Sequence, residues 1–291
     1  MKTLEQHSRI IRKYNKPYTY YFLCTVIPWA FWFLSGYLSH LDPFTKTLEW
    51  ATGITGFLGL MAPVIISLAV IWPDKAMRAD FLGRFFNFKS IKPEYIFLAC
   101  FLMLSSILLA QAISLLFGYS AEQFAFSDSF SFTSSLFPVW FLLIAAPVLE
   151  ELAWHSYGTD TLMTRFNLFT TSILFATYWA VWHFPLSTIK GYYHSNLEVS
   201  GLLYSLNFIL SLLPFVIIMN WIYYKSRRNI ILTIVFHITA GLFNEIFATH
   251  PMSKVIQTGL LAMLAIYLVE RDKELFFSKI KKASSGQFIS A

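Results

Sequence analysis

The stretch WATGITGFLGLMAPVIISLAVIW, residues 50–72, contains no ionisable side chain over 23 consecutive residues. As an α-helix it would rise about 1.5 Å per residue and would therefore cross the roughly 30 Å of hydrocarbon in a bilayer. The whole chain has the same character, because 56% of its 291 residues are hydrophobic and only 13% are charged. A water-soluble protein could not build both a core and a solvated surface from this composition. The sequence predicts an all-α integral membrane protein.

Other long apolar stretches lie on both sides of residues 50–72, and the last of them is the shortest. We expect about eight transmembrane helices in one polytopic membrane domain, residues 18–269. A basic N-terminal segment, residues 1–17, precedes this domain, and a basic tail, residues 270–291, follows it. The expected spans are Tyr18–Leu38, Trp50–Trp72, Tyr95–Phe117, Leu136–Tyr157, Leu168–Leu186, Gly201–Tyr224, Ile230–Ala248 and Val255–Val269.

The positions of the basic residues indicate how the chain is oriented. Of the 22 Lys and Arg residues, only Lys46, Lys190 and Lys254 lie on the side of the expected spans opposite the N-terminus, which leaves the other 19 on the N-terminal side. Cytoplasmic loops carry the excess of Lys and Arg, so we expect both termini in the cytoplasm. We expect a bacterial inner (plasma) membrane as the location, with a eukaryotic membrane as the alternative. Basic flanks that face anionic lipid headgroups account for the net charge of +6. Membrane lipid is therefore an expected partner, and nucleic acid is not.

Polar and ionisable side chains occur inside three of the expected spans. Each charged group there costs about 2.5–3.5 kcal/mol on insertion scales, so each is a candidate for function. They are Glu150, Glu151 and His155 in the fourth span, His183 in the fifth, and His237, Asn244 and Glu245 in the seventh. We expect a polar active-site cavity between spans four, five and seven.

The spacing of these residues suggests separate roles. Glu150 and Glu151 are adjacent on a helix and point about 100° apart, so they cannot use one partner in the same way. Glu151 lies one turn before His155, where a contact between residues i and i+4 can form. In the seventh span Asn244 follows His237 by seven residues and therefore lies nearly on the same helix face.

Glutamate and two histidines from different helices can activate a water molecule in two ways. In the first, Glu150 takes a proton from water as general base, aided by His183, while His237 and Asn244 donate hydrogen bonds to a developing oxyanion. In the second, Glu150, His183 and His237 bind Zn²⁺ and its fourth position holds the water. The residue types alone do not decide between a general-base site without a cofactor and a zinc site. Both cysteines of the chain lie inside expected spans, which excludes a disulfide framework or a cysteine zinc site.

Two other classes of function use the same residue types. Carboxylates and histidines inside spans also form proton relays, so a proton-coupled transporter is one alternative. No repeated halves of the kind found in many transporters are visible in the sequence. A noncatalytic membrane protein, such as an immunity or scaffold protein derived from an enzyme, is the other alternative.

Three segments together resemble a known family. They are EELAWHSYG, WAVWHFPL and RRNIILTIVFHITAGLFNE, residues 150–158, 179–186 and 227–245. In order and approximate spacing they resemble the signature segments of the CPBP family, the Abi-like intramembrane proteases that include CAAX prenyl endopeptidases and bacteriocin-processing enzymes. The resemblance covers about residues 53–247, since GFLGLMAPVIISLAV followed by a basic loop also resembles the region of that family ahead of the glutamates.

The resemblance implies an intramembrane endopeptidase. It makes Glu150 the water-activating glutamate, Glu151 its supporting neighbour, and His183 and His237 the histidines of the second and third segments. It implies a peptide or protein as substrate, either a lipidated C-terminal peptide or a bacteriocin leader peptide.

The chain departs from the family pattern at two positions. The family usually has arginine at the position of His155, and a neutral histidine cannot hold a carboxylate as a permanent bidentate cation does. It usually has asparagine or aspartate at the position of Gly241. Asn244 is the candidate substitute, about 4.5 Å further along the helix axis. Because of these two departures, a noncatalytic member of the family stays among the alternative functions.

Overall fold

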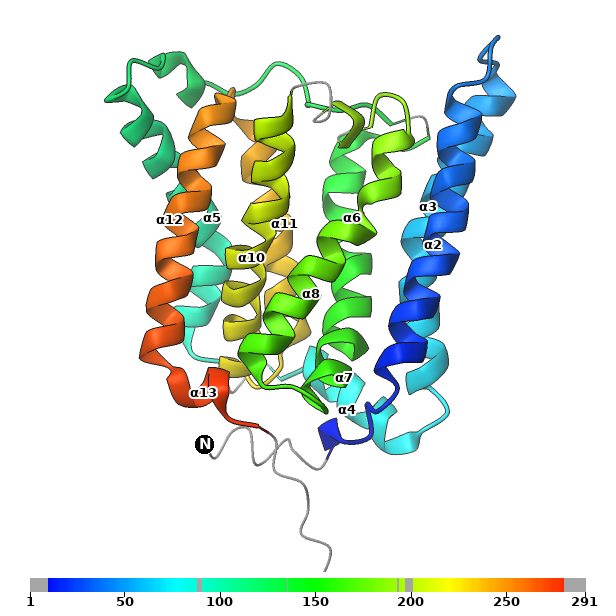
Figure 1. The fold of residues 1–291 in the computed structure, drawn as a ribbon, viewed down its shortest axis with the longest axis vertical. Coiled ribbons are helices and arrows are strands. Elements are labelled where there is room, and N and C mark those ends of the chain that lie inside the picture. Colours follow the sequence, from blue (N-terminus) through cyan, green and yellow to red (C-terminus); the bar gives the residue numbers. More distant parts are fainter. Residues whose placement is uncertain (1–9, 88–90, 135, 193, 197–200, 280–291) are drawn as a thin grey trace, which may run out of the picture.

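The computed structural model describes residues 10–87, 91–134, 136–192, 194–196 and 201–279. The described chain is helical between its loops, and the only β-type pairing recorded within these ranges is an isolated bridge between Phe126 and Phe247. Figure 1 shows the long helices side by side in one bundle. The long helices are α2 (Pro17–Ser39), α3 (Lys46–Ile71), α5 (Pro93–Leu115), α6 (Val139–Ala153), α8 (Leu168–Trp182), α10 (Leu202–Lys225), α11 (Ile230–Ile246) and α12 (Pro251–Arg271).

Short helices lie at the ends of the bundle. The helices α4 (Lys75–Phe85), α7 (Thr159–Met163) and α13 (Lys273–Phe277) gather at one end, which we call the basic end (Figure 1). The 3₁₀ helices η2 (Ala121–Phe124) and η4 (Phe184–Thr188) follow α5 and α8. Parts of the predicted terminal segments, residues 1–9 and 280–291, lie outside the described residues.

Local sequence signals explain where the helices begin. Proline occupies the first position of α2, α5 and α12, where its missing N–H costs no hydrogen bond. The side chain of Asn229 accepts from the backbone N–H of Leu232 at 3.0 Å and caps α11. Asp74 caps α4 in the same way, through the N–H groups of Ala76 and Met77.

The region after the second expected span is not only a basic loop, as the sequence had suggested, because it contains α4. This helix mixes basic and apolar residues without a long apolar run, so hydropathy does not reveal it. Two of its side chains, Met77 and Phe81, are buried against the bundle. The helix therefore packs on the bundle and does not extend away from it.

The predicted spans agree with helices of the structure, with differences in length. Among the residues that the structure describes, six helical segments are long and apolar enough to cross a membrane, and the fourth of them runs from Val139 to Met163. The eighth predicted span, Val255–Val269, is longer in the structure, where α12 covers Pro251–Arg271. The fifth and seventh spans correspond to the shorter helices α8, with 15 residues, and α11, with 17 residues.

The surface of the bundle is apolar, as expected for a protein surrounded by lipid. Large hydrophobic side chains on the long helices are well exposed, among them Phe22, Ile65, Phe97 and Ile266. Within the bundle, by contrast, the ionisable side chains of Glu151 and His155 lie in the interior and are fully buried. A soluble protein shows the opposite distribution. The chain is an integral membrane protein.

Candidate active site

The helix that carries both glutamates changes its winding just after them. The helix α6 ends at Ala153 and is followed by a π-helical turn, Trp154–Gly158, that leads directly into α7. π-helical turns are rare and occur often at functional sites. This turn contains His155 and places it within reach of Glu151 on the preceding turn.

Glu150 is held by a residue of α8. Its side-chain oxygen Oε2 accepts a hydrogen bond from the indole Nε1–H of Trp179 at 2.7 Å. The same oxygen lies 4.0 Å from Nε2 of His183, at the end of α8. Nδ1 of His183 lies 2.7 Å from the carbonyl oxygen of Trp179 and must carry the proton to donate to it. In neutral His183 the other nitrogen, Nε2, is therefore an acceptor.

Glu151 uses different partners, as the 100° offset predicted. It contacts Nδ1 of His155 through one oxygen and accepts from Nδ1 of His237 through the other, at 2.8 Å. The carboxylate is fully buried and connects α6 to α11. The ring of His237 packs edge-on against Trp179, with 5.2 Å between the centroids, so Glu150, Glu151, His183 and His237 form one cluster.

A chain of hydrogen bonds extends from Glu151 into the protein. Nε2 of His155 lies 3.0 Å from Oδ1 of Asn220, whose amide donates to Oγ of Ser172 at 2.9 Å. Ser172 in turn donates to the carbonyl of Leu168 at 2.8 Å, so the direction of the chain is fixed. Both ring nitrogens of His155 consequently face acceptors. A histidine that is protonated on both nitrogens can donate to both.

A cavity opens in front of this cluster. It has a volume of about 490 Å³ and is lined by Glu150, Trp179, His183, His237 and Asn244, among other residues. Glu151 is not among the lining residues and lies behind Glu150. Glu150, His183 and His237 reach this cavity from α6, the end of α8 and α11.

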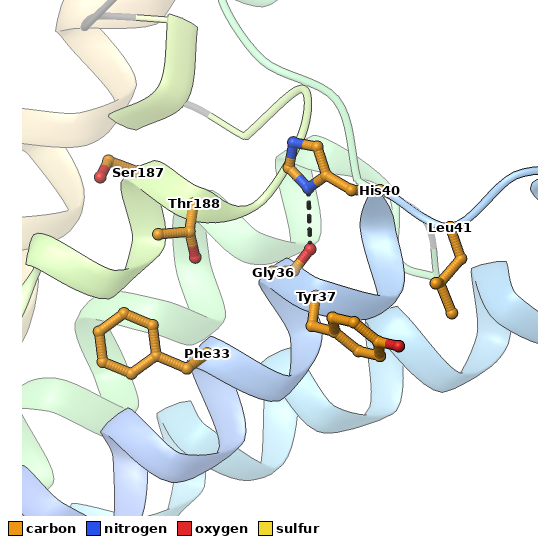
Figure 2. A pocket seen from close by; sticks show the side chains of 7 residues that line it. All are labelled: Phe33, Gly36, Tyr37, His40, Leu41, Ser187 and Thr188. Atoms are coloured by element: carbon orange, nitrogen blue, oxygen red, sulfur yellow. Dashed lines mark hydrogen bonds between the residues drawn. The ribbon is translucent and has the colours of Figure 1, made fainter.

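A second pocket lies between the end of α2 and η4, at the end of the bundle opposite the basic end. Figure 2 shows its lining residues, with His40 donating through Nδ1 to the carbonyl of Gly36 at 2.9 Å. Its volume is about 460 Å³, and its lining residues are Phe33, Gly36, Tyr37, His40, Leu41, Ser187 and Thr188. None of these carries a carboxylate, so this pocket lacks the groups that activate water.

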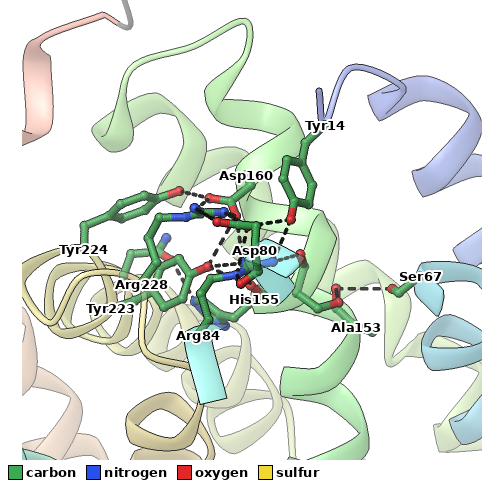
Figure 3. A network of polar contacts seen from close by, with 12 residues as sticks. Tyr14, Ser67, Asp80, Arg84, Ala153, His155, Asp160, Tyr223, Tyr224 and Arg228 are labelled. Carbon is green, nitrogen blue, oxygen red and sulfur yellow. Dashed lines mark hydrogen bonds and ion pairs between the residues drawn. The ribbon is translucent and has the colours of Figure 1, made fainter. Parts of the chain in front are cut away.

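A buried ionic network anchors the π-helical turn at the basic end (Figure 3). The guanidinium of Arg84 donates to the carbonyls of His155 and Ser156, each at 2.8 Å, and to Asp160 at 2.9 Å. Arg228, from the connection between α10 and α11, contacts both Asp160 and Asp80. The network therefore joins α4, the π-helical turn, α7 and the start of α11.

The structure brings four of the five predicted site residues into one cluster: Glu150, Glu151, His183 and His237. Asn244 lines the same cavity, but its amide donates to the carbonyl of Ala240 at 2.8 Å, so its oxyanion role stays a prediction.

Two residues of the cluster were missed by the sequence reasoning. Trp179 lies in the segment WAVWHFPL, one turn before His183, but the sequence indicated no role for it, and Asn220 lies outside the three signature segments. Asn220 is a polar side chain inside the apolar run of α10, and that was an available signal.

The zinc hypothesis requires three ligands that converge. Within the described ranges, no group of three or more His, Cys, Asp or Glu side chains is arranged to hold a metal ion. His237 directs Nδ1 to Glu151 and His183 directs Nδ1 to a backbone carbonyl, which leaves Nε2 of each ring for another partner, as in metal-bound histidines. What is missing among the described residues is the convergence of three ligands on one point, so the mechanism below uses only the side chains.

Comparison with known proteins places the chain in a family. Residues 132–243 match the family model described as type II CAAX prenyl endopeptidase Rce1-like, and this segment contains Glu150, Glu151, His183 and His237. A relative from Methanococcus maripaludis, named CAAX prenyl protease 2, is 40% identical over 270 residues, which are 92% of this chain and 98% of the relative. This membership favours the protease over the transporter and the noncatalytic alternatives. The chain belongs to the CAAX prenyl protease family and is an intramembrane endopeptidase.

Proposed function

We propose that this protein cleaves a peptide bond near the carboxyl end of a prenylated protein, with a water molecule activated by Glu150. The relative is named as a CAAX prenyl protease. A CAAX sequence is a C-terminal four-residue sequence whose cysteine carries the prenyl group. We prefer this substrate to a bacteriocin leader peptide for that reason. The observation that carries the proposal is the position of Glu150, whose carboxylate lines the cavity 4.0 Å from Nε2 of His183.

The spacing of these two groups suits a bridging water. Oε2 of Glu150 and Nε2 of His183 are too far apart for a direct hydrogen bond, but one water can donate to both. Both of its hydrogens then point to the protein, and an oxygen lone pair faces the substrate. Trp179 keeps the carboxylate in place by its hydrogen bond to Oε2 at 2.7 Å.

The reaction follows the usual course of peptide hydrolysis by a general base. Glu150 takes a proton as the water oxygen bonds to the scissile carbonyl carbon, and the carbonyl oxygen becomes an oxyanion. We assign His237, protonated on both ring nitrogens beside the Glu151 carboxylate, to donate a hydrogen bond through Nε2 to that oxyanion, with Asn244 as a second donor. When the C–N bond breaks, Glu150 returns the proton to the leaving amine, which restores the site.

Glu151 acts through its neighbours and does not touch the substrate. It fixes the ring of His237 through Nδ1, as a carboxylate orients a catalytic histidine in other hydrolases. His155 holds Glu151 from the other side in place of the arginine that the family usually has. In this proposal the histidine keeps the function of the arginine because Asn220 supplies an acceptor for its second nitrogen.

For the topology, we propose eight spans with both termini in the cytoplasm. The helix α11, with 17 residues, is at the lower limit for a span, and α8 with the η4 helix that follows it covers residues 168–188. Arg78 belongs to α4, which lies at the basic end, and Arg165 follows α7 at the same end, while Arg227 lies in the connection between α10 and α11. The domain boundaries proposed above, including a core at 53–247, and the kind of membrane stay predictions.

The test is cleavage of a synthetic farnesylated CAAX peptide by the purified protein and by Glu150→Gln. Glutamine keeps the size of the side chain and its contact with Trp179 but cannot take the proton, so kcat/KM should fall about 10²–10⁴-fold. A matched control is Glu122→Gln, an exposed carboxylate of η2 that does not line the cavity, which should cleave like the wild type. Retained cleavage in a well-folded Glu150→Gln protein would overturn the proposal.

A further inference from the structure

The cavity continues well beyond the Glu150 cluster toward the start of α12. Its middle is apolar, with Leu142, Leu143 and Phe215 among the lining residues. The part of the cavity farthest from Glu150 is polar, and its lining includes Glu245 and Lys254. This part lies toward the end of the bundle opposite the basic end, where α12 begins (Figure 1).

Lys254 differs from every other described residue that lines the cavity, because it is the sole Lys or Arg among them. It is also one of only three Lys or Arg residues on this side of the predicted spans, whereas 22 are present in the chain. A cation here is costly next to lipid, so it requires a compensating group. The structure offers one candidate nearby, the carboxylate of Glu245.

Glu245 is already engaged by another segment. One of its oxygens accepts from the backbone N–H of Ser131 and the other from the Ser131 hydroxyl, both at 2.8 Å. It interacts electrostatically with Lys254, but no ion pair within 4.0 Å and no side-chain hydrogen bond is recorded for Lys254 in the part of the chain that the structure describes. The ammonium group therefore keeps its donors for a ligand in the cavity.

The position of Lys254 along the bundle defines how long such a ligand must be. Glu245 follows His237 by eight residues on α11, which is about 12 Å along the helix axis. An extended peptide covers about 3.3–3.6 Å per residue, so three to four residues bridge this distance. Three residues follow the cysteine in a CAAX sequence, and the last of them carries a free carboxylate.

We propose that Lys254 binds the C-terminal carboxylate of the substrate and thereby sets the number of residues between the scissile bond and the chain end. This inference rests on the proposed function and adds the group that recognises the end of the peptide. The two residues before the carboxylate would lie along the apolar middle of the cavity, which suits aliphatic side chains. The peptide would enter with its carboxyl end directed away from the basic end.

The experiment compares two farnesylated CAAX peptides that differ only at the C-terminus, one with a free carboxylate and one with an amide. Cleavage of each is measured with the wild type, Lys254→Gln, Lys254→Arg and a matched control, Lys46→Gln, an exposed lysine on the same side. A charge-assisted hydrogen bond predicts that the wild type and Lys46→Gln prefer the free acid about tenfold or more. Lys254→Gln should lose this preference through slower cleavage of the acid alone, and Lys254→Arg should keep most of it.

A longer peptide tests the register. Three extra residues after the CAAX sequence move the carboxylate about 10 Å past Lys254, so this peptide should behave like the amide with every variant. Equal cleavage of acid and amide by the wild type, or an unchanged preference in Lys254→Gln, would overturn the inference while leaving the proposed function intact.

Failure of the proposed function gives a different result, in which the wild type cleaves neither peptide. Binding of the acid and the amide to the Glu150→Gln protein, measured by competition, then still decides whether Lys254 recognises the carboxylate. Equal binding there would overturn the inference as well. The thermal unfolding midpoint of Lys254→Gln is recorded beside these assays, since a role of Lys254 as counter-ion to Glu245 alone would lower it without changing the ratio between acid and amide.

Discussion

Two clusters of buried charge lie on either side of the π-helical turn, and they differ in how completely their groups are paired. In the network at the basic end, Arg84 and Arg228 are balanced by Asp80 and Asp160, and the guanidinium groups contact carboxylates, tyrosine hydroxyls or backbone carbonyls. In the cluster beside the cavity, Glu150 accepts from Trp179, and its carboxylate faces the cavity 4.0 Å from His183 without a direct hydrogen bond to it.

The difference separates a structural role from a reactive one. A buried charge whose partners are all supplied by the protein has nothing left to offer a substrate, and it stabilises one conformation. A carboxylate with an unused side on a cavity can take up water and a proton. The two clusters are connected, because Arg84 and the hydroxyl of Tyr223 both donate to the carbonyl of His155 at 2.8 Å. The fully paired network at the basic end thus supports the backbone of the cluster beside the cavity.

We expect the largest effect from removing the charge of Asp160, in the network at the basic end. This fully buried carboxylate is shared by both arginines, so Asp160→Asn leaves an uncompensated cation in the interior. We expect a loss of about 3–5 kcal/mol in stability, which on the scale of soluble domains lowers the unfolding midpoint by on the order of 10 °C. Thermal unfolding of the detergent-purified protein measures it.

The matched variants for this prediction are Glu150→Gln and the double variant Asp160→Asn/Arg228→Gln. Glu150→Gln should unfold within about 2 °C of the wild type, since a neutral side chain on the cavity leaves no charge unpaired. The double variant restores the balance of charge and should recover part of the lost stability. If Asp160→Asn is as stable as the wild type, the network is not the structural element that we describe.

A smaller effect is expected where the two clusters meet, at Asn220. Asn220→Ala removes the acceptor for His155 and should reduce kcat/KM roughly tenfold, because a hydrogen bond to a charged group is worth about 1.5–3 kcal/mol. In a His155→Arg background the cation is permanent, and the same Asn220→Ala change should then cost less than about threefold.

The comparison of these two backgrounds distinguishes positioning from general damage. Asn220→Asp keeps an acceptor toward His155 and should retain most activity in the wild-type background. An equal loss on Asn220→Ala in both backgrounds would mean that Asn220 only packs between α8 and α10 and does not act through His155.

The smallest effect concerns an ion pair at the rim of the basic end. Asp272 follows α12 and accepts from Lys225 at 2.5 Å and from Trp221 at 2.7 Å. Its partial burial alone would raise the pKa of the carboxyl, but the hydrogen bonds from Lys225 and Trp221 outweigh this and hold that pKa below its ordinary value. A lowered pKa means that the stabilisation is present above the unfolded-state pKa of about 3.9 and is lost as the pH falls further.

The expected difference between the wild type and Asp272→Asn is therefore at most about 1 kcal/mol above about pH 5, because the pair is partly exposed to solvent. The difference should disappear as the pH falls below about 4. Unfolding midpoints of both proteins at pH 7, 5 and 3.5 measure it, and a constant difference across this range would argue against the carboxylate as its source.

The helices were largely predictable from the sequence, and two exceptions show why. An apolar run of about 20 residues has few structures open to it in lipid, since every backbone group must be paired internally. The helix α4 has no such run and was missed for that reason. The π-helical turn was also missed, because the residues Trp154–Gly158 have no pattern that distinguishes π from α winding.

Within the site, the prediction succeeded where helical geometry alone decides a contact. The offset of Glu150 from Glu151 predicted separate partners, and the spacing of Glu151 and His155 predicted their contact. The hydrogen bond from Trp179 to Glu150 joins residues 29 positions apart, and the contact of His155 with Asn220 joins residues 65 apart. No periodicity connects residues on different helices, so these pairs depend on how the helices pack.

The sequence by itself determined that this is a helical membrane protein, which residue types carry its chemistry, and which family it resembles, because hydropathy and motif spacing are properties of the chain. Only the tertiary structure decided that Glu150 faces a cavity while Glu151 lies behind it, and that His155 is held by Asn220. It also decided that Arg84 and Arg228 are buried with Asp160, although the sequence suggested only basic flanks. The physical reason is that the sequence gives the direction of a side chain on its own helix, whereas its partners depend on how the neighbouring helices pack.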